Sequence, residues 1–488
     1  MLAAMRRHAL LLCLLACKST DKATPARGSA GSAGSAAAAA KPPPERLFEA
    51  WLAAFNAADR AKLVAFHEQY FPYREGMDAD RELSFRQGTG GFEIKQVEKS
   101  TDKEVEVLVK ERDSEQYARA SMAVEPGPPQ KVGRFDVRAI PTPDTYRPQR
   151  LSEADTLKEL RSFLDKQAAT DKFSGAVIVA KNGTPIFSEA YGLADRDKRI
   201  KNTVDTRFRI GSMNKMFTAT AIVQLAQAKK LALTDPLAKL LPKYPNATFA
   251  KKVTIHHLLT HTGGTGDIFG PEFNKHRKEL RTLDDYVKLY GTRDLQFEPG
   301  AQWVYSNYGF LLLGVVIEAA SKQTYYDYVR KHVFEPAGMV ATSSPMEDGK
   351  ERPPDRSIGY MRPDAKGWQP NTDTLPIRAT SAGGGDSTVK DLLAFANALT
   401  SNKLLDAEHT KLLTTGKVDT PGGDKYAYGF EDATKEGRRC FGHNGGAPGM
   451  NGELTICDNG YTIAVLANMD PPAASRVEQF VLDRLPLE

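Results

Sequence analysis

The sequence lacks any concentration of charge of one sign. Its 488 residues contain 66 lysines and arginines against 61 aspartates and glutamates, which gives a formal net charge of +5. The charges are interspersed, without the basic stripe and interleaved aromatic residues that nucleic-acid-binding proteins show. This distribution argues against a nucleic-acid partner. The length predicts roughly two or three domains with sizeable cores.

The apolar stretch near the N-terminus is too short to span a bilayer. Residues 9–16 follow the positive pair Arg6 and Arg7, which is the pattern of a secretory leader. Leu14-Leu-Ala-Cys17 comes next and resembles the lipobox of bacterial lipoproteins. The resemblance implies cleavage before Cys17, a diacylated thiol, and a lipid anchor on the periplasmic side of a bacterial membrane, inner or outer. An ordinary signal peptide with an incidental cysteine is the alternative.

Cysteine is scarce, with four residues in the whole chain. Within the signal segment 1–17, Cys13 is removed by the cleavage before Cys17 and Cys17 carries the lipid, so only Cys440 and Cys457 remain in the folded part. Both lie in strand-like runs that flank a glycine-rich turn expected at 442–449, and an oxidising periplasm would permit a disulfide between them. Two buried thiols are the other interpretation, because sequence does not reveal geometry.

The part of the chain after the leader begins with a tether and a small domain. Residues 18–45 are polar and then rich in Gly, Ser, Ala and Pro, a composition that forms a flexible linker. Residues 46–143 predict a small α+β domain, in which two helices precede a meander of four strands. In element order it resembles the nuclear-transport-factor-like cone. It holds no catalytic constellation, so we expect it to be a spacer or a substrate-docking module. The predicted strands span 92–97, 105–110, 117–124 and 131–139.

Residues 155–488 predict a larger α+β domain. Hairpin patterns stand near both of its ends, one with an Asn-Gly turn at 181–183 and one with the same turn at 458–460. Between them the patterns are mostly helical, at 215–230, 307–321 and 389–400, and a last helix follows at about 474–484. We therefore expect an antiparallel sheet built from both ends of the domain, with helices on its faces and a helical insertion.

The most informative motif is Ser212-Met-Asn-Lys215, where a loop becomes a helix. Positions i and i+3 share a helix face, so the Lys215 amine can accept the Ser212 proton or stabilise the alkoxide. Near a helix N-terminus the Ser212 N–H can also bind an oxyanion. A second Ser-x-x-Lys, Ser387 to Lys390, is better explained by hydroxyls that cap the following helix.

Two further motifs complete a candidate site. Tyr305-Ser-Asn307 precedes an apolar run that reads as a buried helix. A Tyr305 phenolate could take the Ser212 proton if nearby positive charge lowers its pKa, and Asn307 could bind a substrate carbonyl. A packing aromatic is the structural alternative for Tyr305.

The last motif, Gly442-His443-Asn-Gly445-Gly446, lies before the C-terminal hairpin. His443 could offer charge or a hydrogen bond to the substrate. The Gly446 N–H could complete an oxyanion hole with that of Ser212, since glycine lets a ligand approach the backbone closely. A tight glycine turn without a function is the alternative.

In this order and context, Ser-x-x-Lys, Tyr-x-Asn and His-x-Gly resemble the three motifs of the serine β-lactamase and penicillin-binding superfamily. The closest branch is that of class C β-lactamases, D-Ala-D-Ala carboxypeptidases and esterases, over about residues 155–485. The resemblance implies that Ser212 is acylated and that Lys215 and Tyr305 transfer protons. One departure matters, because class C β-lactamases carry Lys-Thr-Gly at the third motif.

The resemblance further implies that Asn307 contacts the substrate amide and that His443 with Gly445 forms the third element. Because His443-Asn-Gly445 is closer to the carboxypeptidase and esterase members, hydrolysis of β-lactams is in doubt. No second carboxylate that would activate a deacylating water can be assigned from the sequence.

A metal site is not expected, although His257 and His261 are four residues apart with Asp267 nearby. The Glu of a His-Glu-x-x-His motif is missing, so this segment reads as a structural turn. The sequence therefore predicts an exported serine hydrolase without metal or cofactor. Its candidate substrates are small peptides such as peptidoglycan stems, small esters and β-lactams. A penicillin-binding receptor or sensor with little turnover, or a true β-lactamase, remains an alternative, and the oligomeric state is open.

Overall fold

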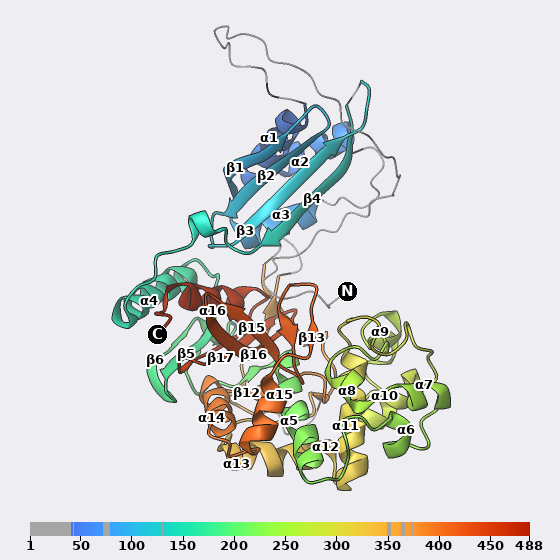
Figure 1. The fold of residues 1–488 in the computed structure, drawn as a ribbon. Coiled ribbons are helices and arrows are strands. Elements are labelled where there is room, and N and C mark those ends of the chain that lie inside the picture. Colours follow the sequence, from blue (N-terminus) through green and yellow to red (C-terminus); the bar gives the residue numbers. More distant parts are fainter. Residues whose placement is uncertain are drawn as a thin grey trace. The chain divides into compact units, whose positions relative to one another are not determined.

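The computed structural model describes residue 41 and residues 43–71, 79–128, 130–348, 353–362, 367–372 and 374–488. The chain divides into two compact units (Figure 1). The larger unit comprises Pro148–Arg362 and Trp368–Glu488, and the smaller consists mainly of the described residues before Pro148. Cys17 and the linker 18–40 lie outside the described residues. No helix within the described ranges has both the length and the apolarity that a membrane crossing requires.

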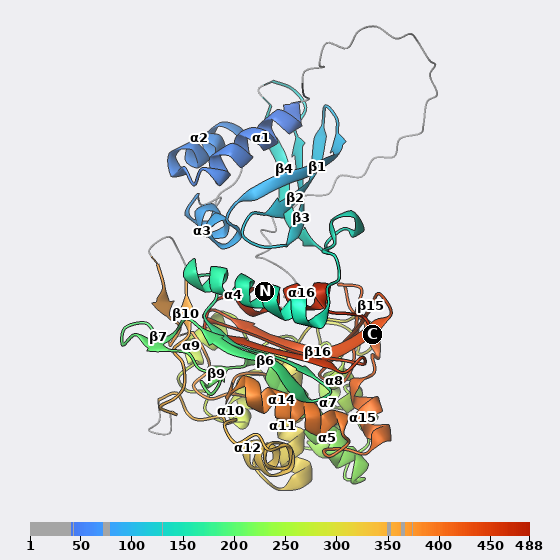
Figure 2. The same ribbon diagram turned by 90° about the vertical axis from the view of Figure 1, so that its left-hand side faces the viewer.

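The smaller unit packs three helices against one face of a four-stranded antiparallel meander (Figure 2). Its core is formed by aromatic and aliphatic side chains such as Phe48, Trp51 and Phe55, which recur on one face of the first helix. The elements are α1 Pro43–Asn56, α2 Arg60–Tyr70, α3 Ala79–Thr89, β1 Phe92–Ser100, β2 Glu104–Glu111, β3 Tyr117–Val124 and β4 Val132–Ile140.

All four predicted strands and the first two helices of this unit are present, but α3 was not predicted. The buried residues of α3 are Ala79, Glu82 and Thr89, which do not form an apolar pattern with the period of a helix. The Glu82 carboxylate accepts a hydrogen bond from Trp51 Nε1 at 3.1 Å and lies 3.1 Å from His67 Nε2. Polar pairing with α1 and α2 therefore holds this helix in place.

The larger unit contains an eight-stranded sheet in the order β13-β14-β15-β16-β17-β18-β5-β6. All of its pairs are antiparallel, and β18 pairs with β5 from Tyr461 opposite Lys181 to Ala467 opposite Gly175. This confirms the prediction that both ends of the domain build one sheet. The strands are β13 Val418–Asp419, β14 Lys425–Tyr426, β15 Glu431–Lys435, β16 Arg438–Ala447, β17 Met450–Cys457, β18 Tyr461–Ala467, β5 Gly175–Lys181 and β6 Thr184–Tyr191.

Helices cover both faces of this sheet (Figure 2). Successive residues of β5 alternate between two cores, because strand side chains point to opposite faces. Val177 packs with α4 Glu153–Ala169 and α16 Ala473–Arg484, whereas Ile178 packs with the helical insertion. The longest insertion helices are α5 Asn214–Gln227, α11 Asn307–Ser321 and α14 Val389–Thr400, close to their predicted ranges.

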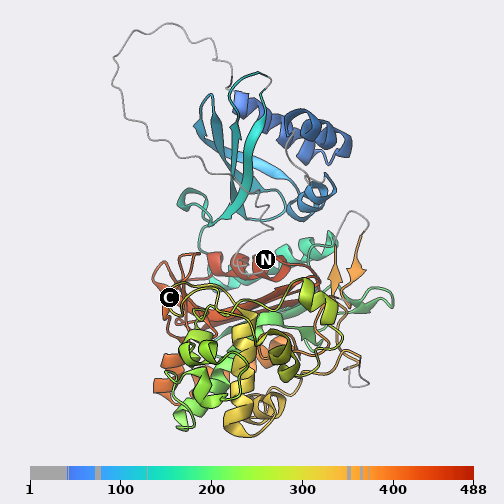
Figure 3. The same cartoon turned by 90° about the vertical axis from the view of Figure 1, so that its right-hand side faces the viewer.

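Shorter elements complete the larger unit (Figure 3). The helices are α6 Leu237–Leu240, α7 Ala247–Lys252, α8 Ile255–Leu259, α9 Pro271–His276, α10 Leu283–Tyr290, α12 Tyr325–Val329, α13 Glu335–Ala337 and α15 Ala407–Thr414. The strands are β7 Leu193–Asp195, β8 Ile200–Lys201, β9 Phe208–Arg209, β10 Tyr360–Met361, β11 Gln369–Pro370 and β12 Asp386–Ser387, and η2 Gly211–Met213 and η3 Arg330–Phe334 are single turns. One further turn, η1 Asp144–Tyr146, belongs to the smaller unit.

The glycine-rich segment is a strand and not the expected turn at 442–449. β16 continues to Ala447, and only Pro448 and Gly449 connect it to β17. Gly445 serves close packing, since a Cβ there would lie 2.1 Å from the carbonyl oxygen of Ile210. The absence of side chains therefore lets the segment before Ser212 rest directly on β16.

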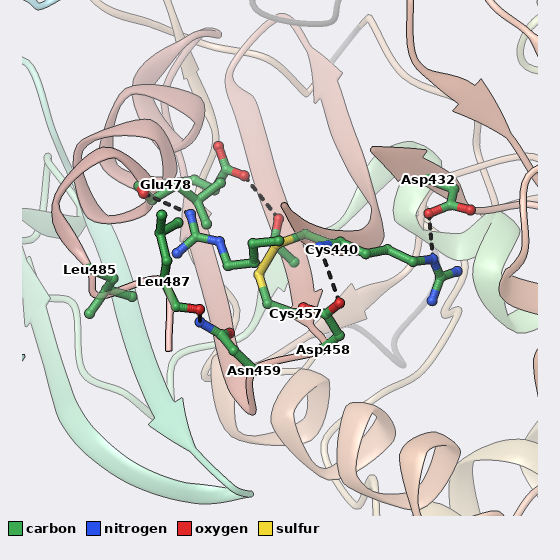
Figure 4. Close-up of a disulfide and its surroundings, with 12 residues drawn as sticks. Asp432, Cys440, Cys457, Asp458, Asn459, Glu478, Leu485 and Leu487 are labelled. Carbon is green, nitrogen blue, oxygen red and sulfur yellow. Dashed lines mark hydrogen bonds and ion pairs between the residues drawn. A yellow bond between two sulfur atoms is a disulfide. The ribbon is translucent and has the colours of Figure 1, made fainter. Parts of the chain in front are cut away.

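A disulfide joins Cys440 of β16 to Cys457 of β17, which the sequence had left open (Figure 4). The two cysteines are directly opposite each other in the antiparallel ladder. The bridge therefore cross-links β16 and β17 at one end of their pairing. Gly446, six residues further along β16, lies near the other end.

Candidate active site

Ser212 and Lys215 lie where η2 passes into α5. The turn and the helix follow each other without a break, so the two side chains lie on the same side as the i, i+3 spacing predicts. Lys215 Nζ is 3.2 Å from Ser212 Oγ. Ser212 is partly exposed, whereas Lys215 is completely buried. A reagent can therefore reach the hydroxyl, while the amine is shielded from water.

The surroundings of Lys215 favour its neutral form. Burial lowers the pKa of Lys215 to about 7, although the charge of Asp267 opposes the shift. The amine also contacts two acceptors, Asn307 Oδ1 at 2.8 Å and the carbonyl oxygen of Ala382. A neutral amine has two N–H bonds and one lone pair. If the two oxygens accept hydrogen bonds from the two N–H groups, the lone pair faces the Ser212 hydroxyl and can accept its proton.

Tyr305 contacts the same pair but does not meet the condition set for a phenolate base. Its hydroxyl forms a hydrogen bond with Ser212, and Lys215 Nζ lies 4.7 Å from the centre of its ring. Desolvation raises the pKa of Tyr305 well above its ordinary value, reinforced by the charges of Glu431 and Asp267. The condition for a phenolate base is therefore not met, and Tyr305 is a neutral phenol that can donate or relay a proton.

Asn307 is the first residue of α11, capped by the side chain of Ser306. Its Oδ1 accepts from Lys215, and its Nδ2 donates to Asp267 Oδ2 at 3.2 Å. The backbone N–H of Asn307 donates to Asp267 Oδ1 at 3.1 Å. Asn307 therefore lies beside Lys215 and Asp267, which each occupy one hydrogen-bonding position of its amide. Its predicted contact with substrate would use the second lone pair of Oδ1 or the second N–H of Nδ2.

His443 lies on β16, almost fully buried. Its Nε2 is 3.0 Å from the Tyr426 hydroxyl, and its Nδ1 is 2.6 Å from the carbonyl oxygen of Asn444. Nδ1 must donate to that carbonyl, so in the neutral ring Nε2 accepts from Tyr426. The ring centre is 6.4 Å from that of Tyr305. His443 thus borders the site through the two tyrosines, and its contact with substrate stays a prediction.

The register of β16 shows where the Gly446 amide points. Cys440 and Cys457 have Cα atoms 4.1 Å apart, the short spacing of a pair whose backbone groups point away from each other. This pattern repeats at every second pair, so Gly446 opposite Asn451 is of the same kind. The Gly446 N–H therefore points away from β17. Gly211 lies close to this amide, since a Cβ built on it would be 3.4 Å from Gly446 N.

The two predicted oxyanion donors are consequently neighbours. Gly446 N lies near Gly211, the residue that precedes Ser212, on a stretch of β16 beyond Gly442, where the pairing with β15 ends. Donation by two convergent backbone amides is the arrangement that stabilises a tetrahedral intermediate. The role of this pair stays a prediction, but the fold brings its members together.

Sequence reasoning missed His261, which packs against Tyr305 with ring centres 4.3 Å apart. Its Nδ1 accepts from the backbone N–H of Ser306 at 3.1 Å, and burial together with the charge of Lys215 holds its pKa well below its ordinary value. His257 instead takes part in the capping box of α8, where its Nδ1 accepts from the backbone N–H of the N-cap residue Thr254 at 3.3 Å. No group of three metal-ligating side chains occurs in the described ranges. The convergence of His261 and Tyr305 depends on tertiary packing that no local pattern reveals.

The competing Ser-x-x-Lys motif is structural. Thr388 caps α14 by accepting from the backbone N–H of Asp391, as the sequence predicted. Ser387 is buried beside Thr342, while Lys390 pairs with Asp205 at the surface. The hydroxyl and amine of this motif are therefore not partners.

Comparison with known proteins places this geometry in a family. The sequence pattern of the family described as Beta-lactamase matches residues 160–488. A penicillin-binding protein structure from Bacillus halodurans is 32% identical, covers 66% of this chain and 99% of its own, and has a TM-score of 0.60. An octameric penicillin-binding protein homologue from Pyrococcus abyssi is 28% identical over 67% of this chain and 78% of its own, with a TM-score of 0.59. A D-stereospecific amidohydrolase from Streptomyces sp. is 28% identical over 68% of this chain and 97% of its own, with a TM-score of 0.56.

Proposed function

Because the chain belongs to the Beta-lactamase family, a family of serine hydrolases, we propose that it hydrolyses amides or esters through an acyl-enzyme on Ser212. The observation that carries the proposal is the buried amine of Lys215, 3.2 Å from the Ser212 hydroxyl. Its pKa of about 7 gives a substantial neutral fraction at physiological pH. Burial of a lysine without a salt bridge lowers the stability of the folded protein. A chemical role for the buried amine explains why the fold bears this cost.

Acylation begins when Lys215 takes the proton of Ser212 Oγ. The oxygen attacks the substrate carbonyl carbon, and the N–H groups of Ser212 and Gly446 stabilise the resulting oxyanion. The intermediate then collapses, and the bond from carbon to the leaving nitrogen or oxygen breaks. Tyr305 donates its proton to the leaving group and is reprotonated from Lys215, which restores the neutral amine.

Deacylation repeats these steps with water in place of the serine. Neutral Lys215, directly or through the Tyr305 hydroxyl, takes a proton from a water molecule that attacks the ester carbonyl. The second tetrahedral intermediate releases the carboxylic acid, and Ser212 recovers its proton. This scheme needs no second carboxylate, which is consistent with the failure to assign one from the sequence.

Within this chemistry we favour a D-Ala-D-Ala carboxypeptidase or esterase-like activity over β-lactam hydrolysis. His443 stands where class C β-lactamases carry lysine, and the amidohydrolase neighbour is named as D-stereospecific. A β-lactamase and a penicillin-binding receptor with little turnover are the alternatives. Pocket walls rather than the catalytic groups distinguish these substrates.

The purified protein, with Ser212→Ala as the control, can be given a chromogenic ester, a D-Ala-D-Ala peptide and a fluorescent penicillin. Turnover of the peptide supports a carboxypeptidase, and turnover of the ester alone supports an esterase. Stable labelling by penicillin without turnover supports a receptor. Mass spectrometry of the adduct identifies the nucleophile, and an adduct on any residue other than Ser212 refutes the mechanism.

We also propose that the protein is exported and anchored through a lipid on Cys17. The Cys440–Cys457 disulfide supports the proposal, since such bonds persist in oxidising compartments. Labelled palmitate supplied to expressing bacteria should enter the wild-type protein and not the Cys17→Ala variant. A wild-type protein that remains unlabelled and cytoplasmic would contradict it.

A further inference from the structure

We propose that Asp267 is a positioning residue that orients the Asn307 amide and, through it, the Lys215 amine toward Ser212. The inference deepens the proposed acyl-enzyme chemistry and depends on it. Asp267 lies in the segment between α8 and α9, outside the three motifs. Its carboxylate holds Asn307 at two points, by the backbone N–H at 3.1 Å and by the side-chain Nδ2 at 3.2 Å.

The carboxylate decides which way the Asn307 amide faces. An ionised carboxylate only accepts hydrogen bonds, so it selects the NH₂ group of Asn307 and leaves the Oδ1 atom toward Lys215. The opposite orientation would set Oδ1 against the carboxylate, which is repulsive. It would also turn NH₂ toward the amine, where the NH₂ group could be accommodated only by the lone pair that Ser212 needs. Asp267 thus ensures that Asn307 Oδ1 accepts a hydrogen bond from Lys215. The lone pair of the neutral amine is then left to face Ser212 Oγ.

Asp267 is itself fixed in place. Its Oδ1 also accepts from the backbone N–H of Ile268 at 2.8 Å, and its carbonyl oxygen accepts from Arg293 Nη1 at 2.8 Å. The preceding residues are tied to the start of α11, where the Ser306 hydroxyl contacts Thr265 Oγ1 at 2.7 Å and donates to the carbonyl oxygen of Gly266. The carboxylate also stands at the N-terminus of α11, where the helix dipole stabilises negative charge.

The same carboxylate acts on Lys215 through its charge. Several groups surround the amine: Ser212 and Ala382 from segments beside the sheet, the Tyr305 and Phe310 rings, Asn307, and His261. His261 and Tyr305 are neutral at physiological pH, for the reasons given above. Asp267 opposes the effect of burial and favours the ammonium form of Lys215. Removal of its charge should therefore make the amine easier to deprotonate.

The test compares Asp267→Asn with the wild-type protein. A fluorophosphonate labels the nucleophilic serine without requiring a known substrate, and its rate of reaction with Ser212 is measured by mass spectrometry between pH 5 and 10. We expect the plateau rate to fall at least about tenfold, because the Asn307 amide is no longer held in one orientation. We also expect the acid limb of the profile to move to lower pH. A purely structural defect would lower the active fraction and leave the limb in place.

Two further variants separate orientation from stability. Asp391→Asn is the matched control: its carboxylate also accepts from a backbone N–H and a hydroxyl, at Ala341 and Thr342, away from the site. It should lower the Tm and leave the pH limb unchanged. On an Asn307→Ala background, Asp267→Asn should not lower the plateau rate further, since Asp267 acts through Asn307.

The outcomes distinguish the two proposals. Wild-type protein that the fluorophosphonate does not label refutes the serine-hydrolase function. Labelled wild-type protein together with an Asp267→Asn variant of unchanged plateau and unchanged limb refutes the role of Asp267 alone. A plateau that falls equally in the presence and absence of the Asn307 side chain also refutes it, because the effect would not pass through Asn307.

Discussion

The two compact units of this chain use the same construction for different ends. Each packs helices against an antiparallel sheet, and each contains a polar network linked to a carboxylate. In the smaller unit, Glu82 is matched by Trp51 and His67, and all three are buried. In the larger unit the network leads from Asp267 and Asn307 to Lys215 and ends at the partly exposed Ser212 hydroxyl. Every member of the first network is buried, and we call it the closed network. The second, which we call the open network, has partly exposed residues at both ends, Asp267 and Ser212. That difference distinguishes a buried polar group that fixes a helix from one that performs chemistry.

Removal of the Lys215 amine should break the open network completely. In Lys215→Ala we expect Ser212 acylation to fall at least about 10³-fold, because the serine loses its base. Penicillin or fluorophosphonate labelling followed by mass spectrometry measures the effect. Lys390→Ala is the matched control, since that lysine belongs to the competing motif and pairs with Asp205 at the surface. An unchanged rate in Lys215→Ala would exclude Lys215 from the mechanism.

The Tyr305 hydroxyl should matter less than the amine. In Tyr305→Phe we expect kcat to fall roughly 10²-fold with little change in KM, since proton transfer to the leaving group is lost while the ring remains. Steady-state kinetics with the best amide or ester provide the measurement. Tyr461→Phe removes a hydroxyl that donates to Glu153 and should leave kcat unchanged. Equal losses in the two variants would point to stability and not chemistry.

The acid side of the pH profile should reflect Lys215. Its pKa is about 7 and only the neutral amine accepts a proton, so kcat/KM should fall about tenfold per pH unit below that value. The measurement is kcat/KM between pH 4 and 9 at constant ionic strength. A profile that is flat down to pH 5 would mean that a different group is the base.

A change to the closed network should affect stability alone. In Glu82→Ala, Trp51 Nε1 and His67 lose their partner, and the free energy of unfolding of the smaller unit should fall by about 1–3 kcal/mol. Urea unfolding followed by Trp fluorescence measures it. Glu82→Gln keeps an acceptor for Trp51 and should cost less. A large loss of kcat/KM in well-folded Glu82→Ala protein would contradict the distinction between the two networks.

The sequence allowed prediction of the site residues that belong to local motifs, including Tyr305 and Asn307. Ser212 and Lys215 fall at i and i+3, so helix geometry alone brings them together. Asp267 and His261 could not be assigned, because each reaches the site by a loop that packs against the start of α11. Lys215 is buried by neighbours distant in sequence, and so its lowered pKa was also beyond local inference.

The fold was predictable where apolar periodicity was strong and failed where other forces decided. The nearly continuous apolar run of α11 and the apolar run of β5 before its Asn-Gly turn gave correct elements. The segment at 442–447 looked like a turn because it is rich in glycine, yet it is a strand in which Gly445 lets the backbone at Ile210 approach closely. Helix α3 was missed because a carboxylate, Glu82, occupies its buried side.

The pairing of β5 with β18 has a consequence for the order in which the polypeptide can mature. The ribosome synthesises β5 early and β18 only near the end, after the whole helical insertion. Until then β5 has an unsatisfied edge, which is a ready template for aggregation. Translation products that stop before Tyr461 should therefore be insoluble or rapidly degraded, and a nascent chain would profit from a chaperone that keeps it extended.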